Sequence, residues 1–197
     1  MKLSKIFSTF GIICFSLALV FLWQRNNPNR IAFESTSIIK QELLQGKKNP
    51  PVRLVIKNLK LDLPIFPAKI NGQEWETTTK GISWLKFTPV PGEKGNSIIY
   101  GHNWENLLGK LERIRPGAKI EIIYADGSKK IFAVNSTAIV SPKDVSVLKQ
   151  AEDSRITLYT CAGFFDEKRL VIVGKLELDS SSLSAPRNDT ELNSAKL

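Results

Sequence analysis

The sequence of 197 residues has few of the side chains that bind metals or form disulfides: one histidine, His102, and two cysteines, Cys14 and Cys161. A zinc site needs three or four ligands, so one histidine and one available cysteine fall short of a zinc centre. Cys14 lies in an apolar N-terminal run, and we therefore predict that Cys161 is a free thiol rather than half of a disulfide. The acidic residues are scattered along the chain. We predict no required metal and no cofactor.

Charged residues are absent from residues 6–23, an apolar run that follows a short basic tail, residues 1–5. The length of this run is at the short end of what spans a bilayer, and a cleaved signal peptide is the alternative. We predict an uncleaved, single-pass signal anchor in the lipid bilayer of the cell membrane. The bulk of the chain would then lie on the extracytoplasmic side.

The net charge of +9 is concentrated near the N-terminus. Residues 1–60 contain ten Lys or Arg and two Asp or Glu, whereas residues 61–197 contain eighteen and seventeen. A nucleic-acid-binding protein would carry the basic excess on its folded domain, so we predict no nucleic-acid partner. The basic segment fits a solvated linker, or one attracted to anionic lipid or envelope polymer.

Composition divides the rest of the chain into three parts. Residues 24–50 are predicted to form a basic juxtamembrane linker with one short helix, which Thr36 and Ser37 would cap. Residues 51–178 form the predicted catalytic domain, because Pro50 and Pro51 end the linker. Residues 179–197 are rich in Ser, Asn and Asp without apolar periodicity, so we predict a disordered tail.

From residue 52, apolar and polar residues alternate with the period of two that is typical of half-buried strands. The segments that share this character are 52–57, 61–66, 97–101, 119–125, 129–138, 155–161 and 169–178. Asp126-Gly127-Ser128 predicts a hairpin turn. Helical segments are few, with candidates at 104–113 and 144–150. Many short strands between turn residues favour a mostly-β barrel or sandwich.

Three side chains at the ends of predicted strands carry the candidate chemistry: Cys161 closes one strand, His102 follows another, and Arg169 opens a third. A thiolate can attack a carbonyl, an imidazole can carry the proton, and a guanidinium can stabilise the oxyanion. Alone, each residue also fits a structural role: a small buried side chain, a hydrogen-bonded histidine and a solvated arginine. Together they indicate acyl transfer through a thioester.

Six short motifs surround or precede these three residues. In chain order they are Leu61-Asp-Leu-Pro-Ile-Phe66, Pro91-Gly-Glu-Lys-Gly-Asn96, Tyr100-Gly-His-Asn103, Ile114-Arg-Pro-Gly117, Thr157-Leu-Tyr-Thr-Cys161 and Arg169-Leu-Val-Ile-Val173. This order resembles the sortase family of membrane-anchored cysteine transpeptidases. The resemblance covers residues 52–178. Its specific part is the Thr-Leu-x-Thr-Cys element.

The resemblance implies a closed eight-stranded β-barrel with a few short helices and a cleft near the ends of the strands that carry Cys161 and Arg169. It implies that Cys161 attacks a C-terminal sorting signal of LPxTG-like sequence in a secreted protein and forms a thioacyl enzyme. His102 would protonate the departing amine and deprotonate the incoming one, while Arg169 would hydrogen-bond the substrate backbone or the oxyanion. The acceptor implied is an amine such as a peptidoglycan precursor or a pilin lysine, for cell-surface attachment or pilus assembly.

Four other residues are weaker candidates for substrate binding. Thr160 is predicted to contact the substrate backbone or the oxyanion, with a packed strand hydroxyl as the alternative. Phe164 and Phe165 are predicted to line an apolar groove for the Leu and Pro of the signal, with simple packing as the alternative. Asn103 is predicted to orient His102 or contact substrate.

Two other functions fit the same residues. An extracytoplasmic cysteine peptidase would hydrolyse the thioester instead of passing the acyl group to an amine. A non-catalytic, membrane-anchored envelope-binding module would leave Cys161 with an ordinary thiol pKa.

Overall fold

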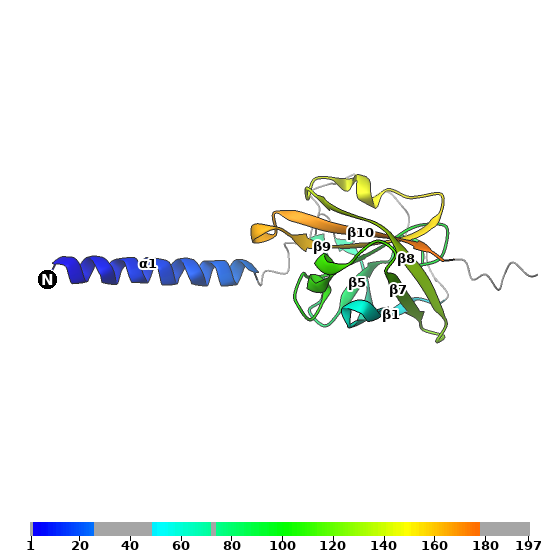
Figure 1. Cartoon of the computed structure of the whole chain (residues 1–197), viewed down its shortest axis with the longest axis horizontal. Helices are drawn as coiled ribbons and strands as arrows, with labels where there is room; N and C mark the ends of the chain where they lie inside the picture. Colours follow the sequence, from blue (N-terminus) through cyan, green and yellow to red (C-terminus); the bar gives the residue numbers. More distant parts are fainter. Residues whose placement is uncertain (1, 26–48, 72–73, 178–197) are drawn as a thin grey trace, which may run out of the picture.

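The computed structural model describes residues 2–25, 49–71 and 74–177 of the chain. It consists of an N-terminal helix, α1 (Lys2–Arg25), followed by a β-barrel (Figure 1). The helix extends away from the barrel along the long axis of the molecule.

Helix α1 contains the apolar run of residues 6–23. None of the helices in the described part of the chain has the length and apolar character that crossing a membrane requires. The prediction of a transmembrane helix over residues 6–23 is corrected accordingly, since a span needs about 20 consecutive apolar residues. The predicted linker helix and the predicted tail, residues 179–197, lie outside the described residues.

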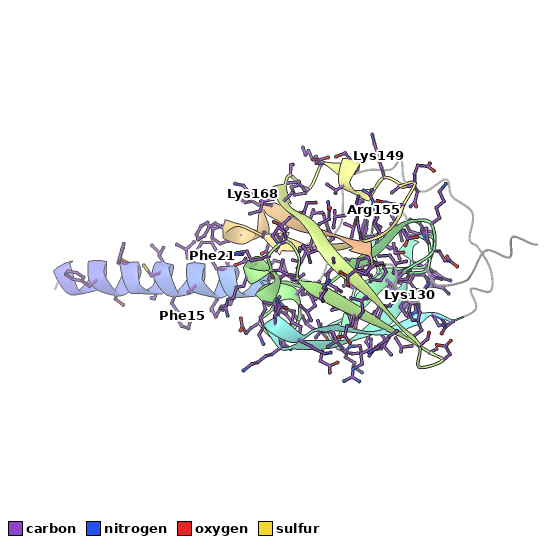
Figure 2. The ribbon with its side chains drawn as sticks, turned by 45° about the vertical axis from the view of Figure 1, so that its right-hand side comes forward. Phe15, Phe21, Lys130, Lys149, Arg155 and Lys168 are labelled. Atoms are coloured by element: carbon purple, nitrogen blue, oxygen red, sulfur yellow. The ribbon has the colours of Figure 1, made fainter. Side chains whose placement is uncertain are left out.

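The C-terminal end of α1 contacts the barrel. The ring of Phe21 lies 4.9 Å from the ring of Phe165, in the turn between the last two strands. Figure 2 shows Phe21 and Lys168 near the junction of helix α1 and the barrel.

Eight strands form the barrel, which confirms the predicted architecture. In chain order they are β1 (Pro51–Ile56), β2 (Leu61–Ala68), β5 (Ile82–Leu85), β6 (Gly95–Tyr100), β7 (Lys119–Tyr124), β8 (Lys129–Val140), β9 (Ser154–Ala162) and β10 (Lys168–Leu176). Around the barrel the order is β1-β2-β5-β6-β9-β10-β8-β7, and β7 pairs with β1 to close it. The pairs β2–β5 and β6–β9 are parallel, and the other pairs are antiparallel.

The remaining described elements are short. They are the hairpin strands β3 (Ile70–Asn71) and β4 (Glu74–Trp75) and the 3-10 helices η3 (Lys57–Leu59), η4 (Leu108–Arg113), η5 (Val145–Leu148) and η6 (Phe164–Asp166). The helices predicted over 104–113 and 144–150 are therefore shorter than expected and of 3-10 type. The predicted hairpin is present between β7 and β8, where Gly127 has φ +82° at the turn.

Two apolar clusters cover opposite faces of the central strands. One fills the barrel and includes Trp84, Ile99 and Leu158. The other lies on the opposite side of β6, β9 and β10, because Tyr100 and Tyr159 follow Ile99 and Leu158 and point the other way. Strands covered on both faces are apolar along most of their length, and all six residues of β6 are buried.

The second cluster is enclosed by short segments outside the barrel. The hairpin β3–β4 contributes Trp75, whose ring packs edge to face on Tyr100 with centroids 4.8 Å apart. The segment between β8 and β9 contributes Leu148 of η5. Cys161 belongs to this cluster, so the candidate nucleophile lies on the outer face of the sheet.

Candidate active site

Cys161 and Arg169 are directly opposed residues of the antiparallel strands β9 and β10. Opposed residues of such a pair point to the same face of the sheet, with Cα atoms about 4.5–5.5 Å apart. Both side chains are nearly enclosed, with exposed fractions of 3% for Cys161 and 4% for Arg169. The turn between β9 and β10 therefore brings Arg169 back beside Cys161.

His102 approaches the same face from the parallel strand β6. Tyr100 pairs with Tyr159 across β6 and β9, and His102 and Cys161 each follow two residues later in the chain. The backbone N–H of Gly101 donates to the carbonyl oxygen of Tyr159 at 3.2 Å, which continues the pairing past the strand end. Because adjacent strands lie about 4.8 Å apart, this register places the backbone of His102 beside that of Cys161.

The backbone after His102 folds into a tight loop that holds the imidazole against an indole. The rings of His102 and Trp104 stack at 11°, with centroids 4.6 Å apart. The N–H of Leu108 donates to the carbonyl oxygen of His102 at 3.0 Å. Gly109 permits this close approach, because a Cβ there would lie 2.5 Å from the carbonyl oxygen of Asn103. The loop thus restricts the His102 ring by stacking Trp104 on one of its faces.

The protonation of His102 is governed by burial and one carboxylate. Burial lowers the pKa of the imidazole below its ordinary 6.5, whereas the charge of Asp166 raises it. The ring is 6% exposed, and its Nε2 atom has no hydrogen-bond partner within the described residues. An imidazole of this kind is neutral near pH 7 and can accept and return a proton.

The guanidinium of Arg169 is held by the turn that precedes it. Its Nη1 donates to the carbonyl oxygens of Asp166 at 2.7 Å and Lys168 at 2.9 Å. Burial raises the pKa of the Tyr159 phenol, and the neighbouring Arg169 guanidinium opposes that rise. Neither Tyr159 nor Asp166 was among the site residues that the sequence identified. Tyr159 has one sequence signal, since it lies two residues before Cys161 on the same strand face.

Thr160 points away from the face that carries Cys161. Its side chain is buried, and Oγ1 donates to the carbonyl oxygen of Gly101 at 2.7 Å. The predicted contact of Thr160 with substrate or oxyanion is therefore corrected, because a hydroxyl inside the barrel cannot face a peptide outside it. Its function is to fasten the residue before His102 to β9.

The other weaker candidates lie at the β9–β10 turn. The amide Nδ2 of Asn103 donates to Oδ1 of Asp166 at 2.8 Å, so Asn103 joins the histidine loop to this turn. Phe164 and Phe165 are exposed at 75% and 40%, and their rings pack edge to face with centroids 4.0 Å apart. Substrate contact by Asn103, Phe164 and Phe165 stays a prediction.

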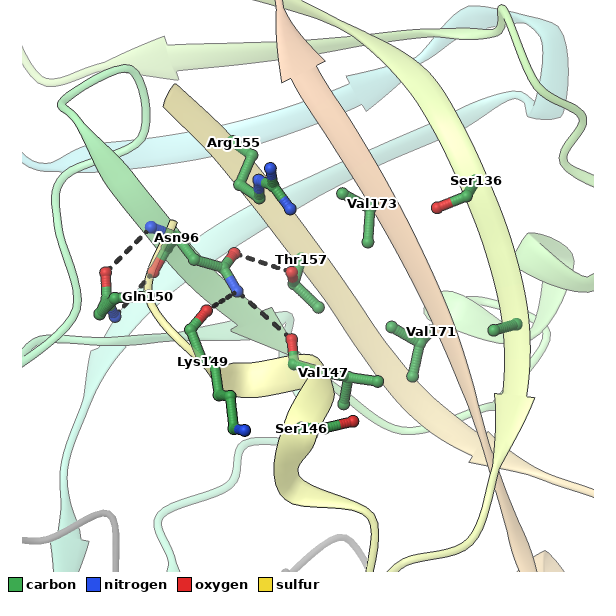
Figure 3. A pocket seen from close by; sticks show the side chains of 11 residues that line it. Asn96, Ser136, Ser146, Val147, Lys149, Gln150, Arg155, Thr157, Val171 and Val173 are labelled. Carbon is green, nitrogen blue, oxygen red and sulfur yellow. Dashed lines mark hydrogen bonds between the residues drawn. The ribbon is translucent and has the colours of Figure 1, made fainter. Parts of the chain in front are cut away.

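A cavity of about 260 Å³ lies farther along the outer face of β9 and β10 (Figure 3). Thr157 lines it on the same strand face as Cys161, about 13 Å away at the rise of a β-strand. Asn96 supplies its polar centre: Oδ1 accepts from Thr157 at 2.7 Å, and Nδ2 donates to the carbonyl oxygens of Lys149 at 3.1 Å and Val147 at 3.3 Å. This network fastens the segment containing η5 to the sheet.

The site offers a thiol, an imidazole and a guanidinium. Cys161 forms no disulfide with Cys14, the other cysteine of the chain, as predicted. Across residues 2–25, 49–71 and 74–177, no three His, Cys, Asp or Glu side chains gather closely enough to hold a metal ion.

The barrel is similar to known sortases. The Sortase domain family model matches residues 54–177. Sortase A of Listeria monocytogenes is 27% identical over 146 residues, which are 72% of this chain and 63% of that protein. The putative sortase YwpE of Bacillus subtilis is 36% identical over 88 residues, 42% of this chain and 84% of that protein. The chain thus spans just under two thirds of the length of the Listeria relative.

Solved structures show the same likeness. Sortase A from Corynebacterium diphtheriae superimposes with a TM-score of 0.55 at 25% identity, covering 69% of this chain and 65% of that one. Sortase C-1 from Actinomyces oris has a TM-score of 0.58 at 22% identity, covering 85% and 99%. The second likeness concerns the fold alone.

Proposed function

Because this chain belongs to the sortase family, we propose that it is a cysteine transpeptidase that cleaves a C-terminal sorting signal of LPxTG-like sequence in secreted proteins. It then joins the new carboxyl end to an amine acceptor, such as a peptidoglycan precursor or a pilin lysine. The observation that carries the proposal is the strand register that brings Cys161, Arg169 and the sole histidine to one face.

In the first half of the reaction, the thiolate of Cys161 attacks the carbonyl carbon of the scissile peptide bond. His102 takes the thiol proton of Cys161 as the thiolate forms. A C–S bond then forms, the C–N bond breaks, and His102 gives that proton to the departing amine. The exposed fraction of His102 is small, so few water molecules compete for that proton. The product is a thioacyl enzyme and a released C-terminal fragment.

In the second half, the acceptor amine attacks the thioester carbonyl. His102 removes a proton from this amine, a C–N bond forms, and the C–S bond breaks; His102 then returns the proton to Cys161. Water in place of the amine would give hydrolysis, so the outcome depends on which nucleophile reaches the thioester first.

Arg169 stabilises the charge that develops on the carbonyl oxygen in both halves. It stays charged at any physiological pH, and its burial strengthens the interaction with an oxyanion. The carbonyl oxygens of Asp166 and Lys168 hold one end of the guanidinium, which limits its movement during the reaction.

We place this activity outside the cytoplasm, at the cell membrane, because secreted proteins are the proposed acyl donors. Digestion of intact cells with an external protease tests this location. A C-terminally tagged chain should be cut in intact cells, whereas a cytoplasmic marker protein should survive.

The activity is tested with the purified 197-residue chain and a panel of sorting-signal peptides, with and without amine acceptors such as triglycine or a lysine derivative. We expect a ligated product at low millimolar acceptor, and its loss in Cys161→Ala. Ligation that persists in Cys161→Ala would exclude this mechanism. Cleavage without ligation at any acceptor concentration would instead indicate a cysteine peptidase.

A further inference from the structure

We propose that Asp166, in the turn between β9 and β10, is a positioning residue that holds His102 and Arg169 in one arrangement. The inference rests on the proposed function, since it concerns the same site. It goes beyond that function by assigning a role to a residue outside the thiol, imidazole and guanidinium.

The first observation is that Asp166 contacts both sides of the site with different atoms. Its backbone carbonyl oxygen accepts from Nη1 of Arg169 at 2.7 Å. Its carboxylate Oδ1 accepts from Nδ2 of Asn103 at 2.8 Å, and Asn103 directly follows His102. One residue of the turn is therefore joined to the guanidinium and to the histidine loop.

The second observation is the backbone conformation of the turn. Phe165 and Asp166 have φ values of +56° and +57°, in the left-handed region. Residues with a Cβ rarely adopt this region, although aspartate and asparagine tolerate it better than most. Two such residues in succession persist only where the surroundings hold them, and strain of this kind gathers at functional sites. Here the strain allows the carbonyl and the carboxylate of Asp166 to reach their two partners.

The third observation is electrostatic. By strand register and chain position, the other titratable groups near His102 are Cys161 and Tyr159 of β9, Arg169 of β10, and Glu105 three residues along the chain. Among all these groups, Asp166 supplies the charge that raises the pKa of the imidazole against the larger lowering by burial. Its carboxylate thus favours the imidazolium, which is the acid that the departing amine requires.

The test compares substitutions that separately remove the charge of Asp166 and its hydrogen bond with Asn103 while the left-handed backbone is kept. Asp166→Asn keeps tolerance of the left-handed region and an oxygen that can accept from Asn103, and it removes only the charge. Asp166→Gly keeps the backbone conformation and removes both the charge and the hydrogen bond from Asn103. Asp62→Asn is the matched control, because Asp62 lies on the surface in an ion pair with Arg53.

The first readout is the NMR titration of the imidazole in the full chain, which is free of overlap because His102 is the only histidine. We expect the midpoint to move to lower pH in Asp166→Asn and to stay at the wild-type value in Asp62→Asn. An unchanged midpoint in Asp166→Asn would overturn the proposal. This readout needs no turnover, so a moved midpoint in a chain that transfers no acyl group would refute the proposed function and leave the inference standing.

The second readout is the pH dependence of acyl transfer. In Asp166→Asn we expect kcat to fall about tenfold with little change in KM, and the alkaline limb of the profile to move to lower pH. In Asp166→Gly kcat should fall further than in Asp166→Asn. In Asp166→Glu, which keeps the charge, kcat should lie between Asp166→Asn and wild type. Wild-type kcat in both Asp166→Asn and Asp166→Gly would contradict a positioning role, and equal thermal stability of Asp166→Asn and wild type would exclude a folding defect.

Discussion

The hydroxyl of Thr160 provides a stringent test of how the histidine is positioned. Thr160 is buried in the barrel, and its Oγ1 donates to the carbonyl oxygen of Gly101, the residue before His102. Thr160→Val keeps a β-branched side chain of similar volume and removes this donor. Thr160→Ser keeps the donor and removes a methyl group.

Both substitutions should destabilise the barrel to a similar extent. In Thr160→Val a buried carbonyl oxygen loses its partner, which costs about 1–3 kcal/mol. In Thr160→Ser a buried methyl group is lost, which costs about 1 kcal/mol. For a chain of this size each kcal/mol corresponds to about 2–4 °C in Tm.

Activity should separate the two variants. Without the hydrogen bond, Gly101 is held to β9 by its N–H alone, and a displacement of about 1 Å at His102 can lower the rate about a hundredfold. We therefore expect kcat to fall at least tenfold in Thr160→Val and to stay within about twofold of wild type in Thr160→Ser.

The assay is peptide ligation below the melting temperature of both variants, together with thermal unfolding. Equal activity of the two variants, at comparable Tm, would refute the argument that this hydroxyl positions the histidine. A loss in both would mean that packing around Thr160 matters rather than its hydrogen bond.

Three further predictions concern the loop, the outer network and pH. Gly109→Ala should lower kcat about a hundredfold, because its Cβ would lie 2.5 Å from the carbonyl oxygen of Asn103 and displace the loop that carries His102; ligation kinetics measure this. Asn96→Ala should lower the free energy of unfolding by about 3 kcal/mol, since it removes one buried and two partly buried hydrogen bonds; urea unfolding measures this. Burial gives His102 a lower pKa in the folded state than its ordinary 6.5. The unfolded chain therefore binds the proton more readily, and stability should be full above pH 6.5 and fall as the pH drops through the folded pKa. In His102→Gln this part of the acid sensitivity should vanish.

The barrel could be predicted because apolar and polar residues alternate along most of its strands. Strand β7 shows the pattern most directly, with alternate residues buried and Ile120 and Ile122 inside the barrel. Strand β5, Ile82–Leu85, was missed because it is only four residues long and all of them are buried, which leaves no alternation to detect.

The placement of Cys161, His102 and Arg169 on neighbouring strands could be predicted from the sequence, whereas the residues that hold them in place could not. Cys161 lies near the end of β9, His102 follows the end of β6, and Arg169 lies near the start of β10. Asp166 had no signal, because its role depends on a left-handed backbone that local sequence does not specify. For Thr160 the sequence left open a substrate contact or a packed strand hydroxyl, and its buried hydrogen bond to Gly101 fits the second.

The central claim is that Cys161 carries the acyl group between donor and acceptor. The most direct measurement is intact mass spectrometry of the chain mixed with a cleavable sorting-signal peptide without an acceptor, followed by peptide mapping of the adduct. We predict a mass increase equal to the N-terminal half of the donor, located on Cys161 and released on addition of an amine. Cleavage of the donor with no adduct on Cys161, or an adduct that an amine cannot release, would contradict the account.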